Sequence, residues 1–388
     1  MPVINRIGDF AAEMAEWRRW MHRNPELGFD CFKTAGFVAE RLREFGVDEI
    51  HEGIATTGLV AIIQGRGAGE ACIGLRADMD ALPIEEVTGA DYASETPGNM
   101  HACGHDGHTT MLLGAAKYLA ETRNFSGRVA LIFQPAEEGP GGGKVMVDEG
   151  IMERFAIDQV YGIHNAPLYG TNTFHTKPGP IMAAADEYAV VVRGVGGHAA
   201  WPHEAVDPIP PALAMMQAIQ TITSRNLRPS DELVVSVNQI QTGTATNIIP
   251  AEVNFSGTIR TFSKPVQEMT FQRLREIVAG HAAAFGVEAE IEIEVGYPAT
   301  VNHVRETAFA AGVAAEVVGE DNVSTEIAAE MGSEDFSYML EARPGSYLFL
   351  GQGDTAYCHH PAYDFNDEIS PIGASFFARL VEHAQPIE

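Results

Sequence analysis

The spacing of apolar residues predicts a chain in which helices and buried strands alternate. Helical spacing, with apolar residues three and four positions apart, occurs at 7–22, 33–46, 109–121, 304–318 and 370–384. Uninterrupted apolar runs, which indicate strands buried on both faces, occur at 58–63, 71–78, 127–139, 159–170 and 346–353. We therefore expect an α/β fold in which helices flank a mixed sheet.

The middle of the chain follows a different pattern. A strand with a glycine-rich turn begins near residue 186. After it, helices are predicted at about 206–223 and 265–284, and strands at 233–240, 252–262 and 288–296. The order βαββαβ describes a self-contained sandwich of helices on a sheet. We therefore expect a domain at 185–297, inserted into a first domain made of 1–184 and 298–388.

Composition and charge narrow the classes of function. The chain has 388 residues, and 25 Lys and Arg against 53 Asp and Glu give a net charge of −28. Such a charge repels nucleic acid and anionic membranes, so we expect neither as a partner. No apolar run approaches the roughly 18–20 residues that span a bilayer. The N-terminal residues lack the pattern of a secretory signal, and the four cysteines lack paired spacing, so we expect a cytoplasmic protein with free thiols.

The stretch GNMHACGHDGH at 98–108 concentrates residues that bind metals. It contains His101, Cys103, His105, Asp106 and His108. Its glycines allow a tight bend, and helical spacing follows at once. We expect a loop that leads into a helix, with Asp106 in the first turn, where the helix dipole favours an acid. Histidines that cluster by chance, or that cap the helix, are the alternative interpretation.

Polar side chains also lie at the ends of three predicted strands. Asp78 and Asp80 follow the first of these strands, Glu137 and Glu138 the second, and His164 ends the third. Open α/β sheets keep their sites at the carboxyl ends of their strands. We therefore expect these side chains at one edge of the sheet.

Five residues from four loops form the predicted metal centre: Cys103, His105, Glu138, His164 and His359. A structural zinc takes four ligands, so five ligands suit two divalent ions that share one ligand and leave a position open for water. The thiolate favours zinc, whereas carboxylate and imidazole also accept manganese, cobalt or nickel. His360 is adjacent to His359, and of the two we prefer His359 as the ligand.

A metal-bound water also needs a base. Adjacent loop residues can point in different directions, so Glu138 can bind a metal while Glu137 moves the proton; two solvated acids are the alternative. His198, in GGHAAWPH, is a candidate donor to a substrate oxygen after domain closure or from a partner subunit. Asn247 and Arg260 are candidates to bind a substrate carboxylate. Taken alone, each of these three is better explained as a turn or surface residue.

Seven motifs, in order along nearly the whole chain, resemble those of the amidohydrolase branch of the aminoacylase/carboxypeptidase metallopeptidase family. They are RADMDALPIEE, HACGHDGHTTMLLGAA, FQPAEEGPGGG, GIHNAP, GGHAAWPHEAVDP, GSEDFSYM and CHHPAYDFNDE. The branch includes hippurate hydrolases, N-acyl-amino-acid amidohydrolases and auxin-conjugate hydrolases. The resemblance implies a two-metal catalytic domain and an inserted ferredoxin-like domain that often mediates dimerisation. We therefore expect a homodimer or a dimer-based oligomer.

The resemblance also implies roles for the candidate residues. Cys103 resembles the ligand that bridges the two metals, and the other four predicted ligands resemble the rest of the set. Glu137 resembles the general base, and Asp78 resembles the residue that orients a metal-bound histidine. His198 resembles the histidine of the inserted domain that stabilises the tetrahedral intermediate.

The activity that the resemblance implies is hydrolysis of an N-acyl amino acid to a carboxylate and a free amino acid. Asn247 and Arg260 match groups that hold the carboxylate of such a substrate. A dipeptidase or carboxypeptidase of the same family is the first alternative. A metal-bound binding protein without turnover is the second, and the intact Glu137 argues against it. We interpret Cys358, next to His359, as part of the pocket wall.

Overall fold

The computed structural model describes residues 3–167 and 169–387. Its internal contacts divide the chain into two compact units. Unit 1 comprises Met1–Ile181, Thr300–Ala328 and Asp335–Glu388, and unit 2 comprises Met182–Ala299 and Ala329–Glu334. Unit 1 is therefore assembled from segments on both sides of unit 2 in the sequence.

Unit 1 is built on an eight-stranded mixed sheet in the order β1-β2-β4-β3-β5-β16-β6-β15. The strands are β1 Glu49–Ile54, β2 Gly58–Gln64, β3 Gly67–Asp78, β4 Ser126–Gln134, β5 Gln159–Ala166, β6 Phe174–His175, β15 Val323–Ser324 and β16 Gly345–Gly351. The four neighbours β4, β3, β5 and β16 run parallel. Their carboxyl ends therefore lie at one edge of the sheet.

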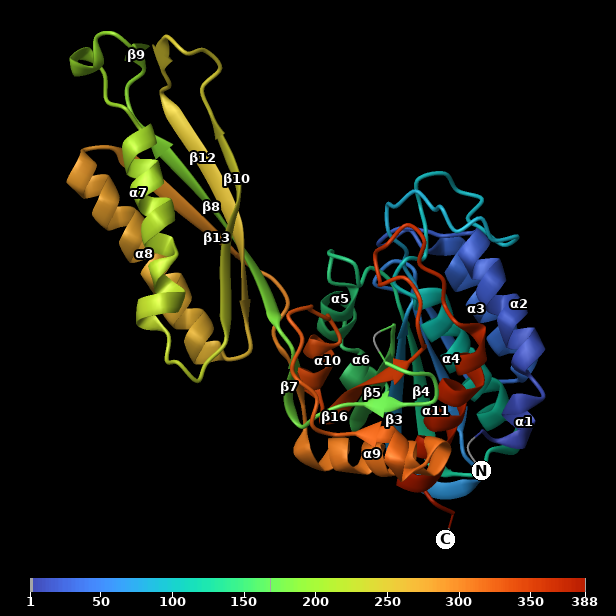
Figure 1. The fold of residues 1–388 in the computed structure, drawn as a ribbon. Coiled ribbons are helices and arrows are strands. Elements are labelled where there is room, and N and C mark those ends of the chain that lie inside the picture. The colour runs from blue at the N-terminus through green and yellow to red at the C-terminus, as the bar shows by residue number, and fades with distance from the viewer. Residues whose placement is uncertain (1–2, 168, 388) are drawn as a thin grey trace. The chain divides into compact units, whose positions relative to one another are not determined.

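Helices cover both faces of this sheet. The helices of unit 1 are α1 Asn5–Gly8, α2 Ala11–Arg23, α3 Phe32–Phe45, α4 His105–Thr122, α5 Gly142–Asp148, α6 Ile151–Arg154, α9 Val304–Val318, α10 Ser337–Ala342 and α11 Ser370–Ala384, with short turns η3 Glu320–Asn322 and η4 Asp367–Ile369. Figure 1 shows α1 to α4 and α11 on one side of the central strands and α5, α6 and α10 on the other. The short strands β7 Gly179–Met182 and β14 Thr300–Asn302 pair with each other.

The predicted α/β fold is confirmed. The sequence pattern missed β1, whose residues are mostly exposed or half-buried because it forms an edge of the sheet. It also missed the short helices α5 and α6. Each is too short to display a helical repeat of apolar residues.

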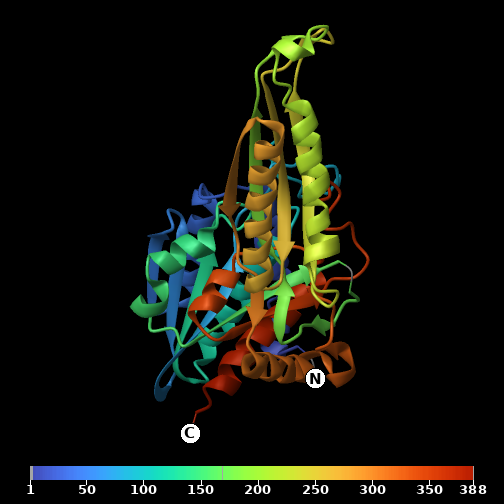
Figure 2. The same ribbon diagram turned by 90° about the vertical axis from the view of Figure 1, so that its left-hand side faces the viewer.

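Unit 2 is a four-stranded antiparallel sheet in the order β10-β12-β8-β13, with two long helices. Its elements are β8 Ala184–Arg193, β9 Gly197–His198, η1 Pro202–Glu204, α7 Ile209–Ile219, η2 Ile222–Asn226, β10 Leu233–Thr242, β11 Ile248–Ile249, β12 Glu252–Thr261, α8 Lys264–Phe285 and β13 Glu288–Val295. Figure 2 shows α7 and α8 side by side over one face of the sheet. This is the strand order and helix placement of a ferredoxin-like βαββαβ unit.

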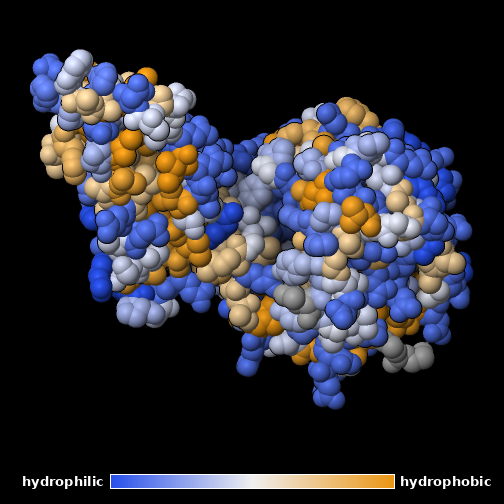
Figure 3. All heavy atoms as spheres, turned by 45° about the horizontal axis from the view of Figure 1, so that its top comes forward, coloured by the Kyte–Doolittle hydropathy of each residue, from blue (hydrophilic) through white to orange (hydrophobic). Residues whose placement is uncertain are grey.

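Burial alternates along the strands of unit 2 because helices cover only one face. On β12, every second residue from Val253 to Thr261 is buried, and the residues that alternate with them are half-buried. In Figure 3, hydrophobic residues form a stripe on unit 2, whereas hydrophilic residues predominate on the visible face of unit 1. Among the described residues of both units, no helix has the length and apolar composition needed to cross a membrane.

Candidate metal centre

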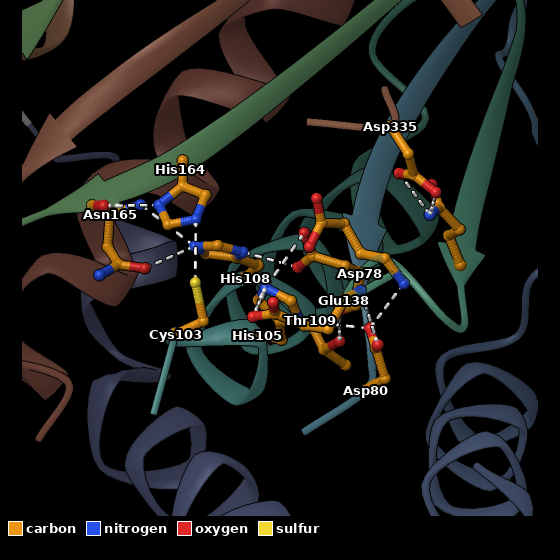
Figure 4. Close-up of polar contacts among 12 residues, drawn as sticks. Asp78, Asp80, Cys103, His105, His108, Thr109, Glu138, His164, Asn165 and Asp335 are labelled. Carbon is orange, nitrogen blue, oxygen red and sulfur yellow. Dashed lines mark hydrogen bonds and ion pairs between the residues drawn. The ribbon is translucent and has the colours of Figure 1, made fainter. Parts of the chain in front are cut away.

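The candidate site lies where the parallel strands of unit 1 end. Asp78 is the last residue of β3, and Glu137 and Glu138 follow the end of β4 at Gln134. His164 lies near the end of β5. Figure 4 shows side chains from these strands converging with those of the loop before α4. The sheet therefore brings together residues that are widely separated in sequence.

The loop before α4 takes its shape from two glycines. Gly104 has a φ of 96°, and a Cβ at this position would lie 2.3 Å from Asn165 Oδ1. A Cβ at Gly107 would lie 2.2 Å from the ring of Phe365. Side chains larger than hydrogen would push the loop away from β5 and from the C-terminal segment. The glycines thus allow Cys103 and His105 to approach the strand ends.

Cys103 belongs to two sets of potential metal ligands. One set combines it with His105 and His164, and the other with Glu138 and His359; within each set the ligand atoms lie within 4.8 Å of one another. Cys103 Sγ is 3.4 Å from His164 Nε2, and Glu138 Oε1 is 3.2 Å from His359 Nε2. The structure therefore brings all five predicted ligands together, with the thiol shared between the two sets.

Glu137 lies beside these ligands and is buried. It forms a further set with His105 and Glu138, again within 4.8 Å. Ala136, immediately before it, has a φ of 58°, which is strained for a residue with a side chain. The strained turn lets two consecutive glutamates reach the same small volume.

Asp80 holds this turn in place. Its two carboxylate oxygens accept the backbone N–H groups of Glu137 and Glu138, each at 3.0 Å. Asp80 Oδ1 also lies 3.3 Å from Nδ1 of His105. Asp78, which we expect to orient a metal-bound histidine, lies 2.6 Å from His108 Nδ1 and 3.7 Å from His105 Nε2, in one potential ligand set with both. The sequence marked Asp80 as part of an acidic cluster and gave it no role.

The charges in this site favour a bound cation. Burial opposes a charged imidazole at His105, yet Asp78 and Asp80 raise the pKa of His105 well above its ordinary value. A hydrogen bond with Cys358 and burial raise the pKa of the Cys103 thiol, and the charge of Glu138 raises it further. Burial lowers the pKa of His164 well below its ordinary range, which leaves the neutral ring that a metal binds.

The donor set also fits a metal by its hydrogen bonding. Both ring nitrogens of His105 and Oε1 of Glu138 are buried and lie within ion-pair distance of neighbouring side chains, but none of them makes a well-aligned hydrogen bond with a described residue. Buried polar atoms are normally hydrogen-bonded, so atoms that lack a bond call for another partner. Imidazole, thiolate and carboxylate donors suit divalent transition metals.

A buried ionic cluster supports the helix that carries His105. In the first turn of α4, Asp106 Oδ2 lies 2.8 Å from Nδ1 of His22 and 3.8 Å from Arg18. Burial lowers the pKa of His22, but hydrogen bonds with Asp106 and Glu86 outweigh it and raise the pKa to about 9. No pattern in the sequence predicts this cluster, because its members lie far apart in the chain.

The adjacent histidines His359 and His360 lie in different surroundings. His359 has a φ of 66°, and its backbone N–H donates to Ala102 O at 2.7 Å, which places it beside the loop before α4. His360 is exposed, and its Nδ1 accepts the backbone N–H of Ala362 at 3.0 Å. Of these two histidines, only His359 belongs to a potential ligand set among the described residues.

The three predicted substrate-contacting residues all lie in unit 2. His198 is exposed, and its ring lies 4.7 Å from that of Trp201. Ala199 N donates to Asn247 O at 3.0 Å, so the segments of His198 and Asn247 are adjacent. Arg260 lies near the end of β12 and donates to Ile259 O at 3.0 Å. The structure therefore brings His198 and Asn247 together and places Arg260 elsewhere in unit 2.

Comparisons with known proteins identify relatives over the whole chain. The profile of peptidase family M20/M25/M40 matches residues 74–383. A hippurate hydrolase of Campylobacter jejuni is 42% identical over 380 residues, which cover 98% of each chain. Thermostable carboxypeptidase 2 of Saccharolobus solfataricus is 38% identical over 394 aligned positions, again covering 98% of each.

A solved structure agrees with these relatives. A Bacillus subtilis protein, described as a dinuclear metal-binding peptidase from the M20 family, superposes with a TM-score of 0.85 at 31% identity. The superposition covers 97% of this chain and 99% of that one. These matches confirm the resemblance predicted from the seven motifs. The chain belongs to peptidase family M20/M25/M40 and is an amidohydrolase.

Proposed function

We propose that this protein hydrolyses the amide bond of N-acyl amino acids, such as N-acetyl or N-benzoyl amino acids, releasing a carboxylate and a free amino acid. The observation that carries this proposal is the sharing of Cys103 between two ligand sets, with Glu137 beside them. A shared thiolate suits two ions, and a neighbouring carboxylate suits a base. The 42% identity to a hippurate hydrolase supports the substrate class, since hippurate is an N-acyl amino acid.

Two divalent ions fit the five ligands. One would be held by Cys103, His105 and His164, and the other by Cys103, Glu138 and His359. Bound there, they would supply an activated water and polarise the amide carbonyl. We favour zinc because of the thiolate, with manganese, cobalt and nickel as the other candidates.

Glu137 moves the protons of the reaction. It takes a proton from the attacking water and delivers it to the leaving nitrogen, so one carboxylate acts first as base and then as acid. Asp80 keeps the carboxylate in position through the backbone N–H of Glu137. The burial of Glu137 keeps bulk water away from the proton path.

The groups of unit 2 act on the substrate from two places. His198 donates to the developing oxyanion, and Asn247 and Arg260 hold the substrate carboxylate. His198 pairs in register with Ile248, just before β12 begins at Glu252. At about 3.4 Å per residue, the start of β12 and Arg260 are about 27 Å apart, more than an N-acyl amino acid spans.

One copy of unit 2 therefore cannot bring both His198 and Arg260 to the same amide. We propose a homodimer, or an oligomer built from such dimers, in which His198 and the adjacent Asn247 of one copy act in the active site of the other, together with Arg260 of that other copy. The remaining assignments follow from the charge and the substrate. The partner is a small molecule, neither nucleic acid nor a membrane is bound, and the protein works in the cytoplasm.

A substrate panel tests this function. The metal-free protein is supplied in turn with zinc, manganese, cobalt and nickel, and product release is measured from hippurate, N-acetyl amino acids and dipeptides. We expect the highest kcat/KM on an N-acyl amino acid. The carboxypeptidase relative supports the alternative that the protein cuts peptides, and faster release from dipeptides would favour it. Absence of turnover on every substrate with every metal would contradict both.

A further inference from the structure

A second thiol lies beside the shared ligand. Cys358 Sγ lies 3.9 Å from Cys103 O, and each thiol changes the pKa of the other. The backbones are also adjacent, since His359 N donates to Ala102 O at 2.7 Å. The hydrogen bond therefore joins the residues next to both cysteines and aligns the two segments.

This arrangement places the two cysteines on neighbouring segments, which favours a disulfide. A disulfide needs Cα atoms roughly 4.4–6.8 Å apart and side chains that face each other. The 3.9 Å approach of Cys358 Sγ to Cys103 O turns the Cys358 side chain toward Cys103.

We propose that Cys103 and Cys358 form a reversible disulfide in the metal-free protein, and that this disulfide and the metals exclude each other. A disulfide sulfur is neutral and is a poor ligand, whereas metal binding needs the thiolate. Because Cys103 belongs to both ligand sets, one bond would disable both. The inference rests on the proposed role of Cys103 as a ligand.

The reaction balances with a disulfide oxidant such as oxidised glutathione. One cysteine thiolate attacks the oxidant and forms a mixed disulfide, releasing one molecule of the reduced thiol. The second cysteine then attacks its partner's sulfur and releases the other reduced thiol. Together the two cysteines lose two protons and two electrons, and the oxidant gains them. A dithiol reductant reverses both steps.

The other cysteines lack this arrangement and serve as controls. Cys31 is buried, and its Sγ lies 3.2 Å from Gly28 O. Cys72 is buried within β3. Cys358 is partly exposed, so a small oxidant can reach it. Oxidation should therefore select the pair formed by Cys103 and Cys358.

Thiol counting tests the proposal without an activity assay. The protein is stripped of metal with a chelator and exposed to oxidised glutathione, and free thiols are counted after denaturation. We expect four thiols to fall to two, with Cys103 and Cys358 joined in one peptide by mass spectrometry. Zinc-loaded protein should keep all four under the same treatment. A wild-type protein without the linked peptide, or with equal oxidation when zinc is bound, would overturn the proposal.

Matched variants separate this inference from the proposed function. After oxidation, Cys358→Ser should keep its three thiols and still bind zinc, as measured by elemental analysis. Cys72→Ser should lose two of its three thiols and bind zinc only after reduction. If Cys358→Ser fails to fold, Cys358→Ala provides the same measurement. If the protein hydrolyses N-acyl amino acids but forms no disulfide, only this inference is contradicted. If it forms the disulfide but does not hydrolyse them, only the proposed function is contradicted.

Discussion

The eight-stranded sheet of unit 1 and the four-stranded sheet of unit 2 differ in what covers them. This difference accounts for the position of the candidate metal centre. In unit 1 every residue of β16 is buried, because helices cover both faces of the sheet. In unit 2 burial alternates along β12, because helices cover one face. A doubly covered sheet excludes charge from its faces, so ionisable residues gather at the ends of its strands. A singly covered sheet keeps a half-exposed face that can meet a partner.

Most of the fully buried charges follow the same division, and unit 2 buries only Asp186 and Glu334 among its described acids. At the strand ends and beneath α4, unit 1 buries Arg18, Arg76, Asp78, Asp80 and Asp106 almost completely. Burying an ion is costly unless a partner of opposite charge or a metal is present. Unit 1 therefore buries charged side chains around the candidate metal centre, where bound metals can offset the cost. The proposed oxyanion donor of unit 2, His198, is exposed.

The sharpest test of this division is Glu137→Gln. We expect kcat on an N-acyl amino acid to fall by about 10³-fold, because the amide cannot accept the proton of the attacking water. Elemental analysis should find both metals, since Glu137 is not a ligand in this proposal. Glu138→Gln is the control and should lose metal as well as activity. If kcat of Glu137→Gln stays within tenfold of the wild-type value, another residue is the base.

Removing the buried arginine tests whether the ionic cluster stabilises unit 1. The Arg18 side chain is fully buried and lies 2.7 Å from Asp367, with Asp106 at 3.8 Å. Arg18→Met removes the buried countercharge that these acids share, leaving only His22 beside Asp106 and Arg19 beside Asp367, and should lower the free energy of unfolding by about 3–5 kcal/mol, measured in urea. Arg19→Met is the control, because Arg19 contacts the same Asp367 but is 42% exposed. It should cost at most about 1 kcal/mol, and equal losses would contradict the argument.

His198→Ala asks whether unit 2 takes part in the reaction. The side chain is exposed, so we expect an unchanged Tm but a fall in kcat/KM of about 10²-fold, from loss of an oxyanion donor. His203→Ala is the control, since His203 is 73% exposed and close in sequence. If both variants keep full activity, the proposed donor is not His198.

Mixing two inactive variants tests the dimer. If His198 acts across subunits, a heterodimer of Glu137→Gln and His198→Ala has one intact site, which combines Glu137 of one chain with His198 of the other. Random reassembly should then restore about a quarter of wild-type activity. Activity no greater than that of the separate variants would show that each site uses its own His198.

Sequence alone predicted the fold because each sheet has its own pattern of burial. Runs such as SYLFLGQG predicted strands covered on both faces, and IEIEV predicted a strand covered on one. The pattern failed at β1, an edge strand whose polar residues conceal the strand period.

The candidate site could be predicted only as far as residue types and motifs reach. Glu138 is marked by its chemistry and its position after a strand, and Cys103 by the ligand-rich stretch that leads into a helix. The contact of Asp80 with His105, and that of Cys358 with Cys103, depend on how loops fold against one another. No spacing in the chain encodes such contacts, so these partners required the structure.

The smallest effect we predict compares the two faces of the sheet in unit 2. Val192 and Val191 are neighbours on β8, but Val192 is fully buried under the helices and Val191 is half-buried on the other face. Val192→Ala should lower the free energy of unfolding by about 2 kcal/mol, from lost burial and a small cavity. Val191→Ala should cost about 0.5 kcal/mol or less if water covers that face. If instead both variants lose the same free energy of unfolding, and the loss for Val191→Ala disappears when the protein is diluted, a second copy covers that face. Both faces of the sheet would then be covered, one by helices and the other by the partner.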